Sequence, residues 1–396
     1  MTKPEDSAAS GLAFRLLTHS EELESIRGEW LTLLQESASN EPMLSPTWLI
    51  RWWQVYGPVD QRELCVAAFH RDGKLVGLAP LCRHKIRHAS GLRVTRLELL
   101  GSGEDEADET CSEYIGVIAA RGEEQAVADA FGSALRAGQL GPWDDLVLTA
   151  MSSEHVMAPL LARALGSATE YKVLGGAPFA RLPDTWDQYL ADLSSSRRAL
   201  IRKSLRAWES WAKEPPVLRR VEVEDQLDEA MAMLARLHAL RWQETGHAGA
   251  FDSPLFDAFH RLTMRDLLRE KALWLCWLEV EGTPVAALYN IVWNQEVRFY
   301  QSGRITDVPK KVRPGLVIHA CAIQEAIAAG YTHYDFLAGT TRYKMQLANN
   351  VRPLIQLSLT RPSFGARLRD LGSESVSLGR SLRNEWRTRF GSKRAP

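Results

Sequence analysis

The chain has 396 residues, a length that suits two domains of ordinary size better than one core. Hydrophobic residues make up 45% and charged residues 24% of it, a composition typical of a globular protein. The formal net charge is −1, which gives no overall electrostatic case for DNA binding.

The cysteine spacing and the first ten residues indicate in which cellular compartment we expect the protein. The five cysteines are scattered and show no spacing typical of a zinc site, so we expect free thiols and no metal. Residues 1–10 lack the apolar core of a signal peptide, and no apolar run approaches the length of a membrane span. We therefore expect a cytoplasmic protein without a transmembrane segment.

Helices and strands alternate in the first half. We expect residues 1–11 to be a disordered lead, followed by a helix over Glu21–Ser37. Ser45 can cap a second helix that begins at Pro46 and ends near Tyr56. The next predicted elements are a hairpin, a strand, a helix and a strand, at Leu64–Phe69 with Leu75–Cys82, Arg96–Leu100, Glu123–Ala137 and Asp145–Thr149.

A long helical pattern, Thr185–Trp211, connects the halves. It carries five cations within ten residues, and three of them share one face, at Arg198, Arg202 and Arg206. Such a helix is either a solvated face or a basic rim for an anionic substrate or a cofactor phosphate. Further helices are predicted over Leu227–Gln243 and from Pro254 to about Arg269.

The second half repeats the order of the first. Apolar strands are predicted at Trp274–Val280, Val285–Val292 and Val297–Gly303, with Gly282 at a turn that corresponds to Gly73. A helix over Leu316–Ala329 and a short strand ending near Asp335 follow. We read two related α/β halves, 12–170 and 171–360, and a basic tail at 361–396.

A cationic turn precedes the apolar helix of the second half. Lys310, Lys311 and Arg313 stand just before Gly315 and Leu316, where the helix opens. The N-terminus of a helix presents N–H groups and partial positive charge. The turn therefore predicts a seat for the phosphate or diphosphate of a cofactor.

Short sequence pieces in a fixed order resemble a known family. They are Ser45-Pro46-Thr47-Trp48-Leu49, Arg241-Trp242, Gly282-Thr283-Pro284-Val285-Ala286, Arg313-Pro314-Gly315-Leu316, Tyr334–Gly339 and Tyr343-Lys344. Together they resemble the GNAT-type acyltransferases of the CelD/BcsL family, named for cellulose biosynthesis. They resemble more distantly the Fem-type aminoacyl transferases, which pair two GNAT-like folds.

The resemblance implies an α/β (α+β) fold with mixed sheets, a tandem GNAT-like acyl-CoA N-acyltransferase. It implies two strands that splay apart, here Val297–Gly303 and Thr332–Leu337, with an acyl thioester between them. The usual Gly-rich loop is replaced by Lys-Lys-Val-Arg-Pro-Gly, in which Gly315 keeps the position of close approach. Acyl-CoA, with acetyl-CoA expected, is then the co-substrate, held by Lys310, Lys311, Arg313, Gly315 and Leu316.

Candidate catalytic residues follow the last strand. Asp335 is the first candidate for the base, and its alternative role is a structural aspartate that accepts N–H bonds from the Gly339-Thr340 turn. The resemblance implies that Tyr343 protonates the leaving thiolate, with a packed aromatic as the alternative. Lys344 can pair with Asp335 or with a substrate anion.

An acceptor pocket is predicted beside these residues. His238, Arg241 and Trp242 end a helix next to a Gly-rich loop, and Tyr300 and Gln301 lie on a splayed strand. The alternative for His238 is a structural histidine.

Three functions remain open. The first is transfer of an acyl group to an amine of a sugar, an amino acid or a small metabolite, in polysaccharide biosynthesis. The second is Fem-like transfer from aminoacyl-tRNA, and the third is a non-catalytic accessory role in a polysaccharide synthesis complex. The first half lacks the cationic turn, so we expect it to be non-catalytic.

Overall fold

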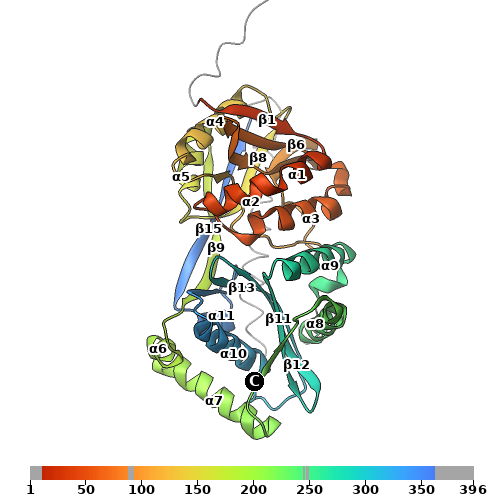
Figure 1. Ribbon diagram of the computed structural model, residues 1–396, viewed down its shortest axis with the longest axis vertical. Helices are drawn as coiled ribbons and strands as arrows, with labels where there is room; N and C mark the ends of the chain where they lie inside the picture. Colours follow the sequence, from red (N-terminus) through yellow and green to blue (C-terminus); the bar gives the residue numbers. More distant parts are fainter. Residues whose placement is uncertain (1–10, 88–92, 244–245, 247–248, 362–396) are drawn as a thin grey trace, which may run out of the picture. The chain divides into compact units, whose positions relative to one another are not determined.

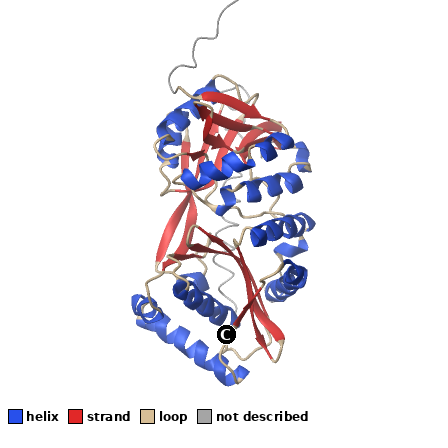
Figure 2. Cartoon of the chain, viewed as in Figure 1, coloured by secondary structure: helices blue, strands red, loops and turns tan. Residues whose placement is uncertain are grey.

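The computed structural model describes residues 11–87, 93–243, 246 and 249–361. The described chain divides into two compact units, one formed mainly by residues 11–174 with 353–361 and the other mainly by residues 175–352. Both contain helices and mixed sheets (Figures 1 and 2), so the predicted α/β class is confirmed. The proposed lead and basic tail lie outside the described residues, apart from Gly11 and Arg361 at their edges.

The first unit holds two sheets. One has the strand order β1-β3-β4-β7, and the other contains β15-β8-β6-β5-β2, in which β6 and β8 are parallel. The strands are β1 (Ala13–Leu17), β2 (Glu63–Leu64), β3 (Val66–Arg71), β4 (Lys74–Ala79), β5 (Leu81–Arg87), β6 (Arg93–Leu99), β7 (Ile118–Ala119), β8 (Asp145–Ser152) and β15 (Asn350–Thr360). The helices are α1 (Ser20–Ser25), α2 (Arg27–Glu36), α3 (Pro46–Tyr56), α4 (Glu124–Arg136) and α5 (Met157–Leu165).

The second unit is built on a sheet of order β10-β11-β12-β13-β14-β9. The strands are β9 (Glu170–Arg181), β10 (Leu218–Arg220), β11 (Leu273–Val280), β12 (Thr283–Trp293), β13 (Glu296–Arg304) and β14 (His333–Asp335). The helices are α6 (Trp186–Asp192), α7 (Ser195–Ala212), α8 (Leu227–Gln243), α9 (Pro254–Arg269), α10 (Pro314–Ala328) and α11 (Arg342–Leu347). Figure 1 shows α8 and α9 on one face of β11–β13 and α10 on the other.

Two neighbouring strands of this sheet part after a short contact. β13 and β14 run parallel and pair at three positions, of which the last joins Arg298 to Asp335. β13 then continues to Arg304, whereas β14 ends. A bulge adds to the divergence, because Tyr289 of β12 pairs with Gln301 and Asn290 with Phe299, which leaves Tyr300 as an additional residue of β13.

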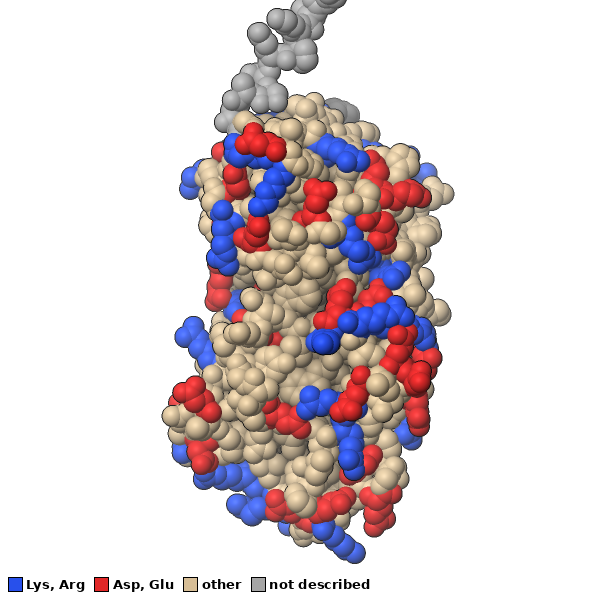
Figure 3. Space-filling view, in the orientation of Figure 1, with Lys and Arg blue, Asp and Glu red and all other residues tan. Residues whose placement is uncertain are grey.

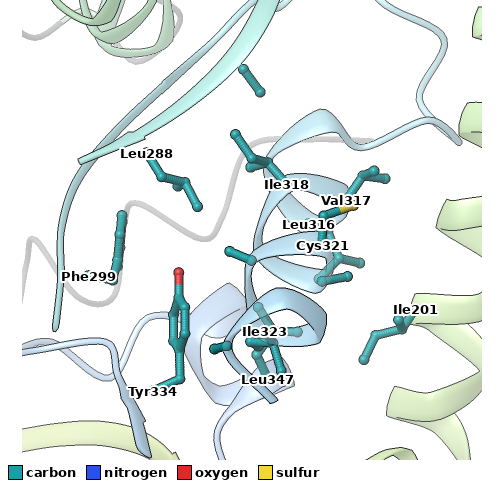
Figure 4. Packing of buried hydrophobic residues seen from close by; sticks show 14 of the residues in the cluster. Ile201, Leu288, Phe299, Leu316, Val317, Ile318, Cys321, Ile323, Tyr334 and Leu347 are labelled. Carbon is teal, nitrogen blue, oxygen red and sulfur yellow. The ribbon is translucent and has the colours of Figure 1, made fainter. Parts of the chain in front are cut away.

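Helix α10 is buried between the sheet and α7. Figure 4 shows Leu288, Phe299 and Tyr334 on one side of the helix and Ile201 of α7 on the other. The side chains of α10 itself are mostly apolar, because the helix packs against the sheet on one face and against α7 on the other. Its polar His319 is also buried, with only 2% of its surface exposed. The position of its first turn is therefore fixed by a packed core.

Most predicted elements are confirmed with corrections at their ends, but the predicted helix over Glu21–Ser37 divides at Ile26 into α1 and α2. Ser45 caps α3 through a bond from Trp48 N, and α8 spans the predicted residues. The predicted helix over Thr185–Trp211 is wrong as a single element, because it breaks at Leu193 and restarts where Ser194 caps α7. Strands β9 and β15 were not predicted.

Among the described residues, no helix has both the length and the apolar character needed to cross a membrane.

One close contact sets the distance between α8 and β13. A Cβ at Gly303 would lie 2.4 Å from His238 N and 2.5 Å from Leu237 C, both in the backbone of α8. We expect Gly303→Ala to lower the free energy of unfolding by about 1–3 kcal/mol, because rigid backbone must shift. Denaturant unfolding measures the change.

Gly175→Ala is the matched control, since a Cβ there meets nothing within 4 Å. If the two variants have the same free energy of unfolding, α8 and β13 can move apart at this contact without loss of stability.

Candidate active site

A cavity of about 430 Å³ lies at the start of α10 in the second unit. Its walls come from four elements and one loop: Arg241 of α8, Ser302–Arg304 of β13, Thr306 and Val308–Lys310 of the loop, Arg313–Leu316, Ile318 and His319 at α10, and Tyr343 and Gln346 of α11. The cavity thus occupies the part of the sheet where β13 continues beyond β14.

The cavity is cationic. Among the described residues, its walls carry four permanent positive charges and no carboxylate, the cations being Arg241, Arg304, Lys310 and Arg313. The first turn of α10 adds partial positive charge and contains no acidic residue. Anionic ligands are therefore favoured here.

The start of α10 is shaped for close approach. Arg313 takes the left-handed conformation at φ 50°, Pro314 fixes the first helical position, and Gly315 follows. The N–H of Gly315 lies in the first turn, where no intrahelical acceptor exists. Lys310 and Arg313, which are exposed, lie on the same cavity.

Arg241 reaches the cavity from α8. Its Nη1 donates to Ser302 Oγ at 2.8 Å, and its guanidinium lies over the ring of Trp242 at 5.6 Å and that of Tyr343 at 5.7 Å. The cation is thus fixed beside the phenol of Tyr343.

Tyr343 and Lys344 diverge as adjacent helical residues do. Tyr343 lines the cavity, and burial raises its pKa above 10.0, an effect that Arg241 opposes. Lys344 lies outside the cavity walls, and its Nζ donates to the carbonyl oxygens of Leu337 at 3.3 Å and Ala338 at 2.5 Å. A protonated phenol therefore faces the cavity, and the ammonium ties down the loop after β14.

Asp335 is buried and 1% exposed, away from the cavity walls. Its carboxylate accepts from Leu337 N at 2.7 Å and Arg352 Nη1 at 3.1 Å, and Arg298 Nη1 lies 3.6 Å away. These contacts match a structural aspartate, with Leu337 in place of the expected Gly339-Thr340 donors.

Half of the remaining predicted residues line the cavity and half do not. Lys310, Arg313, Gly315, Leu316 and Arg241 line the cavity, whereas Lys311, His238, Trp242, Tyr300 and Gln301 do not.

Two of the residues outside the walls are bound within the core. Nδ1 of His238 bonds Ser302 O at 2.9 Å, and Nε2 accepts from Ala250 N at 3.1 Å; burial lowers its pKa to about 4. Tyr300 Oη bonds His260 Nε2 at 3.0 Å.

Sequence reasoning missed five polar or charged residues of the walls, at Ser302, Arg304, Thr306, His319 and Gln346. His319 sits inside an apolar helical run, where the pattern indicates only burial. A single histidine at the second turn after a cationic helix start was the available signal.

Residues 195–345 match the family described as Acetyltransferase (GNAT) domain. This range contains every residue that lines the cavity except Gln346, which directly follows its last residue. The chain is an acyltransferase of the GNAT fold. No curated protein matches it.

Solved structures share the fold at low identity. FemX is 10% identical with a TM-score of 0.59, over 85% of this chain and 96% of that one. A conserved protein of unknown function from Bacteroides thetaiotaomicron is 11% identical with a TM-score of 0.54, over 87% and 100%.

The C-terminal domain of a putative lysylphosphatidylglycerol synthetase from Agrobacterium fabrum is 11% identical with a TM-score of 0.51, over 89% and 96%. At these identities the likeness shows the fold. It extends over both units, so the predicted tandem GNAT-like fold is confirmed.

In the described part of the chain, no group of three or more His, Cys, Asp or Glu side chains is arranged to hold a metal ion.

The contacts of Asp335 predict a cost in stability. We expect Asp335→Ala to lower the free energy of unfolding by about 3 kcal/mol and the melting temperature by roughly 5–10 °C, because two arginines lose a buried partner. Thermal unfolding by circular dichroism measures it.

Asp192→Ala removes an exposed aspartate at the end of α6 and should change stability little. An unchanged melting temperature for Asp335→Ala, together with a large loss of kcat, would restore Asp335 as the base.

Proposed function

We propose that this protein transfers an acyl group from acyl-CoA to an amine of a sugar, an amino acid or a small metabolite. The observation that carries the proposal is the coincidence of three features in one cavity. These are a cationic helix start, the gap beyond the β13–β14 pairing, and a phenol that stays protonated.

The carrier diphosphate fits the first turn of α10. Lys310 and Arg313 supply charge, and the N–H of Gly315 supplies a backbone donor at a position with no side chain. The chain departs from the usual Gly-rich loop by using cations where backbone N–H groups are more common. The side-chain cations therefore contribute more of the binding free energy of the carrier here than they do beside the usual Gly-rich loop.

The thioester end of the carrier fits between the parted strands. Beyond Arg298 the edge of β13 is free of β14, and Ser302–Arg304 form a cavity wall. An extended chain laid there brings its thioester toward α11. Positioning of this kind is a major source of rate in acyl transfer to amines.

Tyr343 is suited to protonate the leaving thiolate. Burial keeps the phenol protonated, and Arg241 lies over its ring, where it can stabilise negative charge on the oxygen or on the sulfur.

In the described part of the first unit, the corresponding helix start is acidic. Helix α4 precedes β8, the parallel partner of β6, as α10 precedes β14. The start of α4 carries Glu123 at its cap and Glu124 in its first turn, and these charges repel phosphate. We therefore assign acyl-CoA binding to the second unit and a non-catalytic role to the first.

The finer assignments rest on sequence resemblance. Membership of the CelD/BcsL family, an acetyl donor, a role in polysaccharide biosynthesis and a cytoplasmic location are all part of the proposal on that basis.

The exposed cations of α7 belong to a mixed surface, since Figure 3 shows positive and negative side chains interspersed. The tRNA-dependent and accessory alternatives have no additional support.

Charge reversal at the cavity tests carrier binding. We expect Lys310→Glu and Arg313→Glu each to weaken the Kd for acetyl-CoA about 10- to 100-fold, because a charge-assisted bond to phosphate is replaced by repulsion. Calorimetric titration measures the Kd, and the melting-temperature shift caused by acetyl-CoA should shrink in parallel.

Lys311→Glu is the matched control, because this exposed lysine lies in the same turn but outside the cavity walls. If all three variants bind as the wild type does, the diphosphate is held elsewhere.

Tyr343→Phe tests the acid. We expect kcat to fall about 100-fold or more with the Kd for acetyl-CoA retained, since one proton transfer is lost. Because burial raises the pKa of Tyr343, the phenol keeps its proton at neutral pH, and the wild-type rate should show no loss from its ionisation between pH 6 and pH 8. Steady-state release of CoA reports both. A wild-type kcat in Tyr343→Phe would remove the phenol from the mechanism.

A further inference from the structure

His319 is an ionisable group inside the cavity that the proposed function does not use. It lies one turn beyond Gly315 on α10 and lines the cavity. Its ring stacks on Tyr343 with centroids 5.9 Å apart and meets Phe299 edge-on at 4.5 Å. The imidazole is thus held beside the proposed acid.

A buried chain of hydrogen bonds fixes the tautomer of His319. Tyr334 Oη donates to Asn290 Oδ1 at 3.4 Å, so its oxygen can accept from Nδ1 of His319, 3.1 Å away. Tyr334 and Asn290 are fully buried. Nδ1 therefore carries the proton, and Nε2 carries a lone pair.

Nε2 has no hydrogen-bond partner within the described ranges of the chain, while the ring lines the cavity. Few other groups there can accept a proton. The walls formed by described residues contain no carboxylate, their four cations are donors, and Tyr343 holds its proton.

We propose that Nε2 of His319 is the group that takes the proton from the attacking amine. The inference rests on the proposed function and names the base of the same site. Tyr334 acts through His319 as a positioning residue.

The charges around His319 keep its lone pair available. Arg241 and Lys344 are the cations near it, and Tyr343 and Tyr334 are its ionisable neighbours. Burial, and then these two cations, lower the pKa of His319 to about 3, so the ring is neutral throughout the physiological range. Such a base acts once the amine nitrogen has gained positive charge and become acidic.

With His319 as base and Tyr343 as acid, each proton of the acyl transfer has a donor and an acceptor. The amine nitrogen attacks the thioester carbon, the C–N bond forms, and an N–H proton passes to Nε2. The C–S bond breaks, and the thiolate takes the proton of Tyr343 Oη. The proton on Nε2 returns to the oxygen of Tyr343, which restores both residues and leaves an amide and free CoA.

His319→Phe removes both ring nitrogens and keeps a flat ring. With acetyl-CoA as donor and glucosamine, lysine or alanine as acceptor, we expect kcat to fall about 100-fold or more with the Kd for acetyl-CoA within about threefold of wild type. His260→Phe is the matched control, because this imidazole is also fully buried but lies outside the cavity walls. Its folded fraction should keep the wild-type kcat.

A measurement without turnover tests the same geometry. In ¹⁵N spectra of histidine-labelled wild type, assigned by difference from His319→Phe, Nδ1 should be protonated and Nε2 bare from pH 8 to pH 5. Tyr334→Phe should shift the ring toward the other tautomer and lower kcat, and a purely structural tyrosine would leave the ring signals in place.

The outcomes separate the two claims. A wild type that releases no CoA with any of these amines refutes the proposed function. An active wild type with an equally active His319→Phe overturns His319 alone. So does a protonated Nε2 in the wild type, because a group that already holds a proton cannot take one.

Discussion

The structure depends on the early end of the pairing between β13 and β14. The two strands pair at three positions and then separate, and the last pair joins Arg298 to Asp335. Asp335 also binds Arg352 and the backbone of Leu337, so the point of separation is held by buried charge–charge contacts. Without that point, β13 would have no free edge for a ligand and α10 would not open onto a cavity.

The same arrangement keeps the carboxylate that stabilises the fold apart from the cations that line the cavity. The carboxylate of Asp335 is used inside the fold, and the cavity walls keep cations and neutral proton carriers. A cationic cavity suits a diphosphate carrier. Burial, followed by the charges of Arg241 and Lys344, lowers the pKa of the neighbouring His319 and keeps its imidazole neutral. The phenol of Tyr343 and the imidazole of His319 then stand together as a donor and an acceptor of protons.

Local patterns predicted most helices and strands because periodicity and caps act within a few residues. Ser45, Ser194 and Ser253 each cap a helix through their side chains, although the break at Ser194 was overlooked within a continuous amphipathic pattern. Strands β9 and β15 escaped prediction because their pairing is set by partners distant in sequence. At the site, the cationic turn was visible in sequence. The sequence did not show whether the side chains of Asp335, Lys344 and His319 face the cavity or the core, because that depends on tertiary packing.

The position of bound CoA decides between a carrier site at α10 and one elsewhere. A crystal structure of the full chain with CoA measures this. We expect one CoA per chain, with its diphosphate at Gly315 between Lys310 and Arg313 and its pantetheine arm along Ser302–Arg304 of β13. A diphosphate bound away from the first turn of α10, or an arm that leaves β13 untouched, would contradict this expectation.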